Sequence, residues 1–549
     1  MKKTAAPQVS NDKISMRNLI MFPLGTIGRD FIYNLFNTFM MTFILLTKHL
    51  TAAELGAITF IVVAARVFDA LNDPIMGGIV ENTRSRWGKY KPWQLVGAVL
   101  TSAVVILLYT VNLDHWAFIG FLALIYLLFS ITFTMNDISY WGMLPTLTSD
   151  NDSRNKLTSF AQIAVTIGGG SAGVLIPMLT TGQAGAALFG SAKRAYAIIS
   201  IVAGLLMVGF QLFTIFGVKE KPLPDNFIKT PRLKFKDIFR TILHNDQLLW
   251  SAVLLLVYNV GTGLAGAGLI TMFVYFEFGY EGTYNTLFYA VMGVLGVVFT
   301  VFYPAFSRRL GRDRTLFTTG IAIIAAYALM LLVGLLVPST KGFDFNFLGI
   351  RLHLNLKFIL MMLAFGLTGW GSGWYMIMTI NIANSVEYNE YKTGKREEGL
   401  IFSLRPLVNK LGSAISVGLV SLVYILSGVL DVTNGISDVE NTFDAMGSLT
   451  AEQQADKLAQ IESLTSGVPT TNKNIMLLCL CLIPIVFMGV AMILYRKFCF
   501  LNENKMDEIA REIAARKSAP DEGNAADFAS DEDNSALVAA DASAPEEPQ

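Results

Sequence analysis

The stretch Arg66-Val67-Phe68-Asp69-Ala70-Leu71-Asn72-Asp73-Pro74 lies inside an apolar run that extends from about residue 55 to about residue 80. Asp69 and Asp73 are four residues apart, so on a helix they lie on one face, one turn apart. Each carboxylate costs about 2.5–3.5 kcal/mol at membrane depth unless it is paired or faces a polar cavity. Together with the amide of Asn72, the two anions offer hard oxygen ligands. We therefore expect Asp69 and Asp73 to bind a small cation. The two acids with Asn72 favour Na⁺ as the metal ion, and H⁺ is the alternative, since a proton needs only one acid.

A structural interpretation of Asp69 stays open. Arg66 precedes Asp69 by about one helical turn, so the two side chains are placed to form an intrahelical ion pair. Such a pair neutralises Asp69 without any bound ion. Asp73 has no basic residue at that spacing, and the cation-binding interpretation therefore rests mainly on Asp73.

The composition around this stretch predicts a protein that crosses a membrane several times. Of its 549 residues, 53% are hydrophobic and only 15% are charged, whereas about a quarter of a soluble protein is charged. The net charge of zero gives no sign of a nucleic-acid partner. The sequence has no Gly-rich phosphate loop and no His-rich metal spacing. We therefore expect no enzyme and no cofactor.

Twelve apolar segments are each long enough to cross a bilayer, which takes about 20 residues. We expect a short N-terminal segment, two six-helix halves, a linker between them and a tail, with bounds 1–17, 18–218, 248–500, 219–247 and 501–549. The predicted membrane segments are 18–47, 52–82, 92–112, 116–146, 157–181, 195–218, 248–277, 284–307, 314–337, 354–386, 400–428 and 474–498.

A weak internal repeat supports the two halves. The turn Arg84-Ser85-Arg86-Trp87-Gly88-Lys89 follows the second segment, and Arg308-Arg309-Leu310-Gly311-Arg312 follows the eighth. A basic turn at equivalent places in two halves is typical of the major facilitator fold, whose substrate site lies at the midplane between the halves. The fold class that we expect is therefore an all-α membrane protein with twelve transmembrane helices.

The loops predict the orientation, because short cytoplasmic loops are rich in Lys and Arg. Every loop after an even-numbered segment is basic, whereas the loop from Asp431 to Asn474 is acidic. We therefore expect both termini in the cytoplasm and a multi-pass protein of the plasma (inner) membrane. Beyond the last segment, Lys505 to Lys517 has the period of a short amphipathic helix, and Ser518 to Gln549 has the composition of a disordered acidic tail.

Other polar residues inside the predicted segments indicate a sugar site. Asp30 and Asp137 offer oxygens that accept hydrogen bonds from hydroxyl groups, and Trp141, one turn after Asp137, offers a ring face for the apolar side of a sugar. Arg405 and Lys410 add cations to the eleventh segment. The alternative is that these charges form salt bridges that hold the halves together, with Trp141 as an ordinary core residue.

Five motifs resemble the glycoside–pentoside–hexuronide:cation symporter family of the major facilitator superfamily. The resemblance covers roughly residues 18–500, and the motif around the second segment is specific. The motifs are Arg66 to Gly77, Thr83 to Pro92, Gly28-Arg29-Asp30-Phe31, Asn136 to Trp141 and Val386 to Gly399.

The resemblance implies roles for individual residues. It implies a coupling-cation site at Asp69 and Asp73, supported by Asn72 and Thr134. It implies a sugar site that comprises Arg29, Asp30, Asp137, Trp141 and Lys410. A family tryptophan falls at Tyr375 or at its neighbour Trp374, and we take Tyr375 as the candidate. Two departures put the substrate in question: Gln162 replaces a sugar-binding arginine, and Arg405 stands where the best-known member has glutamine. A guanidinium binds a carboxylate in a way that an amide does not, so a uronide is an alternative substrate.

The resemblance predicts cation-coupled symport of a glycoside or oligosaccharide by alternating access, with Na⁺ or H⁺ as the coupling ion. A hexuronide or pentoside symporter, a sodium-coupled lysolipid transporter of the same fold and a membrane sensor are the alternatives. We expect a monomer whose partners are a small sugar, a monovalent cation and the bilayer. Gating contacts near the cytoplasmic loops are expected from Arg86, Lys89, Glu387, Glu390 and Arg396.

Overall fold

The computed structural model describes residues 14–148, 150–219, 245–339, 342–347, 350–394, 401 and 404–518, and nearly all of them are helical. The helices before residue 220 form the N-terminal helix group: α1 (Met16–Asn37), α2 (Met40–Thr47), α3 (Ala52–Asn82), α4 (Lys91–Thr110), α5 (His115–Leu147), α6 (Asn151–Thr180), α7 (Gly182–Phe189) and α8 (Ala192–Gly217). The later elements form the C-terminal helix group: α10 (Asp246–Gly266), α11 (Leu269–Phe278), α12 (Gly282–Leu310), α13 (Arg312–Leu336), β1 (Gly342–Phe347), β2 (Ile350–Asn355), α14 (Leu356–Leu367), η1 (Thr368–Trp370), α15 (Gly371–Thr393), α17 (Leu404–Leu426), α18 (Val429–Ala445), α19 (Ala451–Ser466), α20 (Thr470–Phe498) and α21 (Glu503–Ser518).

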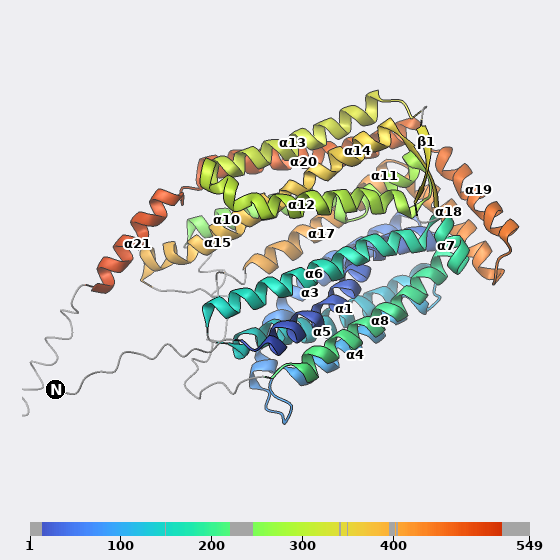
Figure 1. Ribbon diagram of the computed structural model, residues 1–549. Coiled ribbons are helices and arrows are strands. Elements are labelled where there is room, and N and C mark those ends of the chain that lie inside the picture. The colour runs from blue at the N-terminus through green and yellow to red at the C-terminus, as the bar shows by residue number, and fades with distance from the viewer. Residues whose placement is uncertain are drawn as a thin grey trace, which may run out of the picture.

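The two groups lie side by side with their long helices roughly aligned (Figure 1). Helices α1 to α8 form the lower group in this view and α10 to α20 the upper one. One end of the molecule carries α7, α18, α19 and the β hairpin, and we name it the α18 end. The opposite end carries α21, and we name it the α21 end.

Ten spans in the described residues are long and apolar enough to cross a membrane, against the twelve predicted. The predicted segments 18–47 and 52–82 are the two without such a span. The first contains Arg29 and Asp30, and the second contains Arg66, Asp69 and Asp73. Their helices nevertheless lie within the bundle, since α1 packs against α6 and α8, and α3 packs against α5 and α17. The charged residues that suggest a site are therefore the same ones that weaken the hydropathy signal.

Several predicted segments are interrupted. Segment 18–47 is divided into α1 and α2 at Thr38 and Phe39. Segment 248–277 is divided into α10 and α11 at Ala267 and Gly268, where Gly268 has a φ of +100°, a conformation that only glycine adopts at low cost. The break positions α11 at the α18 end, beside α19 and α20.

Two features depart from the predicted all-α architecture. Strands β1 and β2 pair antiparallel, from Gly342 opposite Asn355 to Phe347 opposite Ile350. Apolar residues at every second position of this segment have the period of a strand, so the local sequence carried a signal that the search for long apolar segments passed over. The acidic loop from Asp431 to Asn474 contains most of α18 and all of α19.

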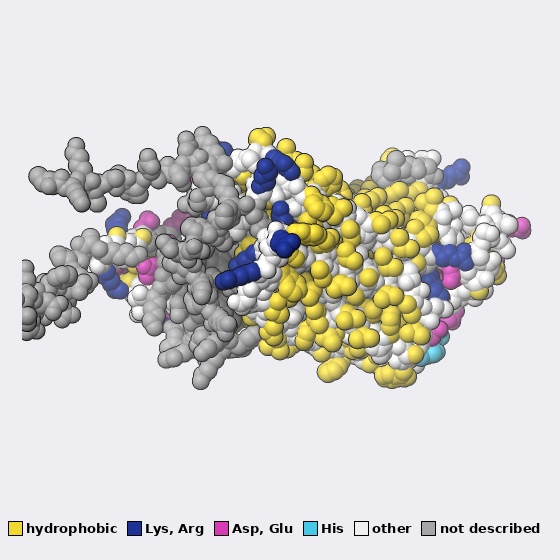
Figure 2. Space-filling model, turned by 90° about the horizontal axis from the view of Figure 1, so that it is seen from below, with side chains coloured by type: hydrophobic (Ala, Val, Ile, Leu, Met, Phe, Trp, Pro, Cys, Tyr) yellow, Lys and Arg dark blue, Asp and Glu magenta, His cyan; other side chains and the backbone are white. Residues whose placement is uncertain are grey.

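The surface has the distribution expected of a membrane protein. Figure 2 shows a broad hydrophobic band over the face of the N-terminal helix group, with charged side chains toward the two ends. Exposed apolar side chains such as Leu205 and Phe216 of α8 belong to this group.

The predicted amphipathic helix over Lys505 to Lys517 is confirmed as α21, whose Met506 and Ile509 pack with Tyr388 and Tyr391 of α15. The predicted acidic tail lies outside the described residues from 519 onward.

Candidate functional site

Helix α3 carries both carboxylates of the predicted cation site. It starts at a capping box formed by Thr51 and Glu54, and it continues through Pro74 to Asn82. Asp69 is buried, and the Ser130 hydroxyl of α5 donates a hydrogen bond to its Oδ1. Arg66 Nη1 lies 3.9 Å from Asp69 Oδ2, while Arg66 Nη2 donates to Asn37 Oδ1 at 2.5 Å. The intrahelical ion pair is therefore present but long.

Asp73 connects the two helix groups. Its Oδ2 accepts from Lys410 Nζ of α17 at 2.6 Å, and its Oδ1 accepts from the Thr134 hydroxyl of α5 at 3.2 Å. The side chains of Asp73 and Lys410 are 32% and 22% exposed, although both lie within long helices. Lys410 was predicted on the sugar side, and the structure places it directly on the predicted cation site.

The other residues predicted to support the cation lie on α3 and α5. Asn72 is buried, and its Nδ2 donates to the backbone carbonyl of Ser130 at 3.4 Å. Ser130 is a site residue that the sequence analysis missed. It precedes Thr134 by four residues, so the two hydroxyls share a helix face; this spacing was a usable signal. In the described residues no three His, Cys, Asp or Glu side chains are grouped to hold a metal. An ion here would therefore be held by two carboxylates together with hydroxyl and amide oxygens.

Arg29 organises the predicted sugar residues of the N-terminal helix group. Its Nη2 donates to Asp30 Oδ2 at 2.9 Å, and its Nη1 lies 3.1 Å from Asp137 Oδ1. The guanidinium also lies over the ring of Trp141, with its carbon 5.4 Å from the ring centre. Arg29 is almost fully buried, whereas the Asp137 side chain is 40% exposed. The arrangement places the partly exposed Asp137 carboxylate and the Trp141 indole on either side of one guanidinium.

A second polar cluster lies on the C-terminal helix group. Arg405 Nε and Asn409 Nδ2 both donate to the Tyr375 hydroxyl oxygen, at 3.0 and 2.8 Å. Asn409 Oδ1 in turn accepts from Asn259 Nδ2 of α10 at 2.8 Å. The prediction favoured Tyr375 over its buried neighbour Trp374, and Tyr375 is the residue in contact with Arg405. Asn409 and Asn259 were missed, although Asn409 follows Arg405 by one helical turn.

Gln162 stands apart from both clusters. Its side chain on α6 is exposed, and the described contacts at this residue involve only its backbone carbonyl, which accepts from the Thr166 hydroxyl. The structure therefore does not bring Gln162 to the other predicted sugar residues.

The predicted gating residues show few contacts within the described part of the chain. Arg86 is exposed, and Lys89 Nζ lies 5.2 Å from the Tyr90 ring centre. Neither forms an ion pair with Glu387 or Glu390 among the described side chains. Arg396 lies outside the described residues.

The described hydrogen bonds between the two groups are concentrated on one side of the molecule. Hydrogen bonds between described side chains of the two groups reach from the α18 end only as far as Asp73 and Lys410. Toward the α21 end, the described residues show no further hydrogen bond or ion pair between the groups. Within the described part of the chain, the hydrogen bonds that join the two groups therefore lie between the α18 end and the Asp73–Lys410 contact.

Most of the chain is similar to a known protein family and to individual sugar carriers. The family described as MFS/sugar transport protein matches residues 21–495. The chain is 29% identical to a lactose permease of Leuconostoc lactis over 78% of this chain and 65% of the relative. It is 28% identical to a raffinose carrier protein of Pediococcus pentosaceus over 75% of this chain and 62% of the relative. The matched region thus spans somewhat less than two thirds of these two relatives.

A glucuronide carrier protein homolog of Escherichia coli is 23% identical over 76% of this chain and 86% of the relative. Among solved structures, the xylose transporter XylE from E. coli superposes with a TM-score of 0.52 at 12% identity, over 88% of this chain and 99% of that chain. The nucleoside transporter NupG gives a TM-score of 0.51 at 14% identity, over 79% of this chain and 100% of that chain. These two structures support the fold alone.

Proposed function

The chain belongs to the MFS/sugar transport protein family, and from that premise we propose that it carries a glycoside or oligosaccharide across the membrane together with a monovalent cation. The observation that supports this proposal most directly is the Asp73–Lys410 contact. It joins a carboxylate of the predicted cation site to a cation of the predicted sugar site across the two helix groups. The names of the relatives, lactose permease and raffinose carrier protein, favour an oligosaccharide.

The contact suggests how ion and sugar are coupled. In this structure the Lys410 ammonium neutralises Asp73, which is the place that a bound cation would occupy. A coupling ion therefore competes with Lys410 for Asp73, and its binding frees Lys410 to face the sugar. Because coupling free energy is reciprocal, the sugar then raises the affinity for the cation by the same factor.

The sugar itself would bind between the two polar clusters. Asp30 and Asp137 are acceptors for hydroxyl groups, and Trp141 supplies the apolar face. Arg405 and Tyr375 lie on the opposite helix group and supply donors. This division of acceptors and donors suits a neutral sugar, whose hydroxyl groups both donate and accept.

A hexuronide is the second candidate substrate. Arg405 uses only Nε in the described hydrogen bonds, so its two terminal nitrogens are placed to bind a carboxylate in a bidentate manner. The likeness to a glucuronide carrier protein homolog favours the same candidate. A pentoside and a lysolipid are weaker candidates, and the charged residues of both clusters disfavour a lysolipid.

We further propose the full membrane topology. Segments 18–47 and 52–82 complete the ten apolar spans to twelve, because α1 and α3 lie within the bundle with their charges facing its interior. The halves 18–218 and 248–500 correspond to the two helix groups. The basic loops favour a cytoplasmic location of the α21 end and both termini in the plasma (inner) membrane. We propose that the chain acts as a monomer, and the described contacts between the groups, which lie between the α18 end and Asp73–Lys410, favour an inward-open conformation.

Binding and uptake measurements test the proposal. Labelled lactose, raffinose, a pentoside and a glucuronide are each measured with the purified protein in proteoliposomes, with and without Na⁺ and at several pH values. We expect one sugar to bind more tightly with Na⁺, or at a lower pH if the ion is H⁺. Binding of none of the four under any of these conditions would contradict the sugar assignment, and lysolipids would then be the next ligands to test.

A further inference from the structure

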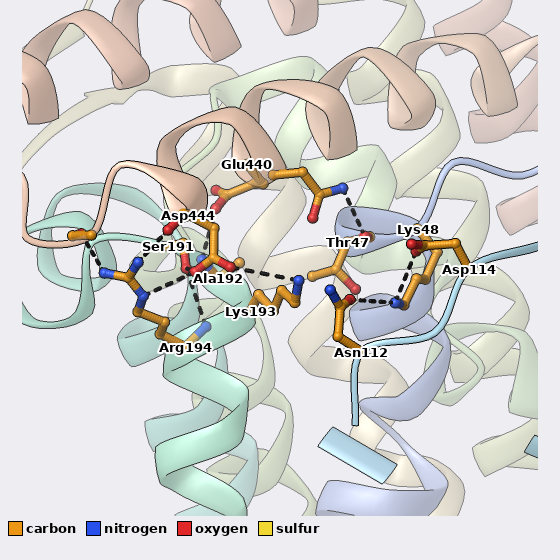
Figure 3. A network of polar contacts seen from close by, with 12 residues as sticks. Thr47, Lys48, Asn112, Asp114, Ser191, Ala192, Lys193, Arg194, Glu440 and Asp444 are labelled. Carbon is orange, nitrogen blue, oxygen red and sulfur yellow. Dashed lines mark hydrogen bonds and ion pairs between the residues drawn. The ribbon is translucent and has the colours of Figure 1, made fainter. Parts of the chain in front are cut away.

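Helices α18 and α19 form a cover over the ends of the N-terminal helix group. Figure 3 shows α18 lying across the start of α8 and the end of α2. Helix α18 packs against α2 and α8, and α19 packs against α7. We name residues 429–466, which comprise both helices, the α18–α19 segment. Most of it lies within the acidic stretch that the sequence analysis treated as a loop.

Glu440 of α18 is the centre of the contact. Its Oε2 accepts from the backbone N–H of Ala192 at 2.7 Å and from Lys457 Nζ at 2.8 Å, and its Oε1 accepts from the Tyr280 hydroxyl at 3.1 Å. Lys457 Nζ also donates to the Gly190 carbonyl at 2.8 Å. Because Ala192 is the first residue of α8, Glu440 supplies a carboxylate to the N-terminus of a helix in the other group.

Asp444, one turn later on α18, binds the same helix start. The Ser191 hydroxyl donates to its Oδ1 at 2.6 Å, and Arg194 Nε lies 3.0 Å from the same oxygen (Figure 3). Two asparagines extend the contact to α2 and the residues after it. Asn434 forms two hydrogen bonds with the backbone of Leu50, and Asn441 donates to the Thr47 carbonyl.

A second point of the interface depends on a glycine. At the start of α12, an added Cβ on Gly282 would lie 1.8 Å from the Pro177 carbonyl oxygen of α6, which no side chain tolerates. Beside it, Glu281 Oε2 accepts from the backbone N–H of Gln183 in α7 at 2.8 Å. The helix groups therefore approach here to backbone contact.

Glu440 and Lys457 stay paired when the α18–α19 segment moves, because both residues belong to it. Both side chains are almost fully buried, at 1% and 2% exposure, and removing one partner of such a pair leaves an uncompensated buried charge. Both nevertheless belong to the α18–α19 segment. When this segment leaves α8, the pair leaves together, and each charge keeps its partner.

We propose that the α18–α19 segment is a detachable lock that holds the α18 end closed. The lock depends on the contacts of Glu440 and Asp444 with the start of α8, and on the close approach of Gly282 to Pro177. The inference rests on the proposed alternating access, in which this end opens to the outside. Opening requires Glu440 and Asp444 to release α8 and Gly282 to withdraw from Pro177. The lock thus sets the ratio of outward-open to inward-open molecules, independently of the sugar.

Distances between spin labels test the lock without any sugar. In a background with Cys479, Cys481 and Cys499 replaced by Ala, labels at Trp116→Cys and Leu336→Cys report the α18 end. Labels at Trp87→Cys and Phe500→Cys report the α21 end. All four native residues are exposed. The test variants are Glu440→Gln and Gly282→Ala.

Matched controls are available on the same helices or segment. Glu462→Gln removes an exposed carboxylate from α19, and Gly293→Ala adds a methyl group on α12 where no atom lies within 4 Å. We expect both test variants to raise the ratio of long to short distances at the α18 end by about tenfold. The distances at the α21 end shorten in parallel, and both controls resemble the parent.

Unchanged distances in both test variants would overturn the lock. If Glu440→Gln does not yield folded protein, the decision rests on Gly282→Ala, which removes no polar group. Labelling of Thr181→Cys with an impermeant maleimide in whole cells gives a second readout, because this buried position lies between α6 and Tyr275 of α11. Labelling that is faster with Gly282→Ala supports the lock, and labelling at an unchanged rate contradicts it. Sugar binding plays no part, so failure of the lock is distinguishable from failure of the proposed transport.

Discussion

The centre of the molecule and its α18 end each contain a Lys–carboxylate pair, and the two pairs differ in every respect that matters for movement. Asp73 and Lys410 come from different helix groups and are about a quarter to a third exposed. Glu440 and Lys457 come from one segment and are almost fully buried. Under the proposed transport cycle, the central pair separates when the helix groups move or an ion binds. The α18-end pair moves as one body. The position of the two partners in the chain, more than the length of the contact, therefore distinguishes an exchangeable pair from a fixed one.

The largest effect is expected from breaking the fixed pair. Lys457→Met leaves Glu440 buried without its counter-charge, which costs about 3–5 kcal/mol for a buried pair. We expect a clear loss of thermal stability in detergent, measured by the unfolding of purified protein. The double variant Glu440→Gln with Lys457→Met restores much of the loss, because no lone charge remains. Equal stability of Lys457→Met and the parent would show that the pair is not buried as described.

The next largest effect is expected at the exchangeable pair. Asp73→Asn removes the carboxylate that contacts Lys410 and that we propose as a ligand of the coupling ion. We therefore expect the cation-dependent gain in sugar affinity to fall by about 10- to 100-fold. Folding is expected to survive, because the Asp73 side chain is partly exposed and amide oxygens still accept from Thr134. Sugar titrations with and without Na⁺ measure the change. Asp114→Asn, at an exposed carboxylate of the α18 end, is the matched control and keeps the gain.

Removing the other partner sharpens the comparison. If Lys410 competes with the ion for Asp73, Lys410→Met raises the affinity for the coupling cation by about tenfold while sugar no longer enhances cation binding. Isothermal titration with Na⁺ measures both quantities. Lys410→Arg keeps the charge and serves as the control. A cation affinity that is lower in Lys410→Met than in the parent would mean that Lys410 supports the ion instead of competing with it.

The smallest effect concerns pH at the α18 end. Burial raises the pKa of Glu281 above its usual value, although hydrogen bonds from Gln183 and Thr283 oppose the shift. In the open state the carboxyl group faces water and its pKa is ordinary, so the closed state binds the proton more tightly. The closed population should therefore grow as the pH falls through this range, and it should shrink as the pH rises. The label pair at Trp116→Cys and Leu336→Cys measures the trend, which Glu281→Gln should reduce.

The central residues illustrate what could be predicted from sequence. Asp69 and Asp73 stand out because ionisable residues inside an apolar segment are costly, and the same reasoning applies to Asp30 and Asp137. The roles of Thr134 and Tyr375 followed only from the family resemblance. In the structure, Thr134 contacts Asp73 and Tyr375 contacts Arg405. Ser130 and Asn409 escaped notice because neutral polar residues carry little cost in a sequence. The one signal that could have identified Ser130 and Asn409 is their position one helical turn from a residue already predicted, Thr134 and Arg405 respectively.

The α18 end illustrates what could not be predicted. Nothing near Glu440 in the sequence indicates Ala192 as its partner, because the two are 248 residues apart. Gly282 is one of 46 glycines, and only the approach of Pro177 makes it special. The β hairpin had a local signal in its alternating pattern, but a search for long apolar segments does not register six-residue strands.

By itself, the sequence determined that the chain is a helical membrane protein with carboxylates inside its second segment. The length of an apolar segment and the charges within it are local properties. Bilayer thickness and the cost of desolvating a charge give both a direct interpretation. It also carried the family motifs. Only the tertiary structure decided which charges meet. The Asp73–Lys410 and Glu440–Ala192 contacts depend on how two helix groups pack, and packing is set by the sum of many weak interactions across the whole chain. The same sum decides which end of the molecule is closed.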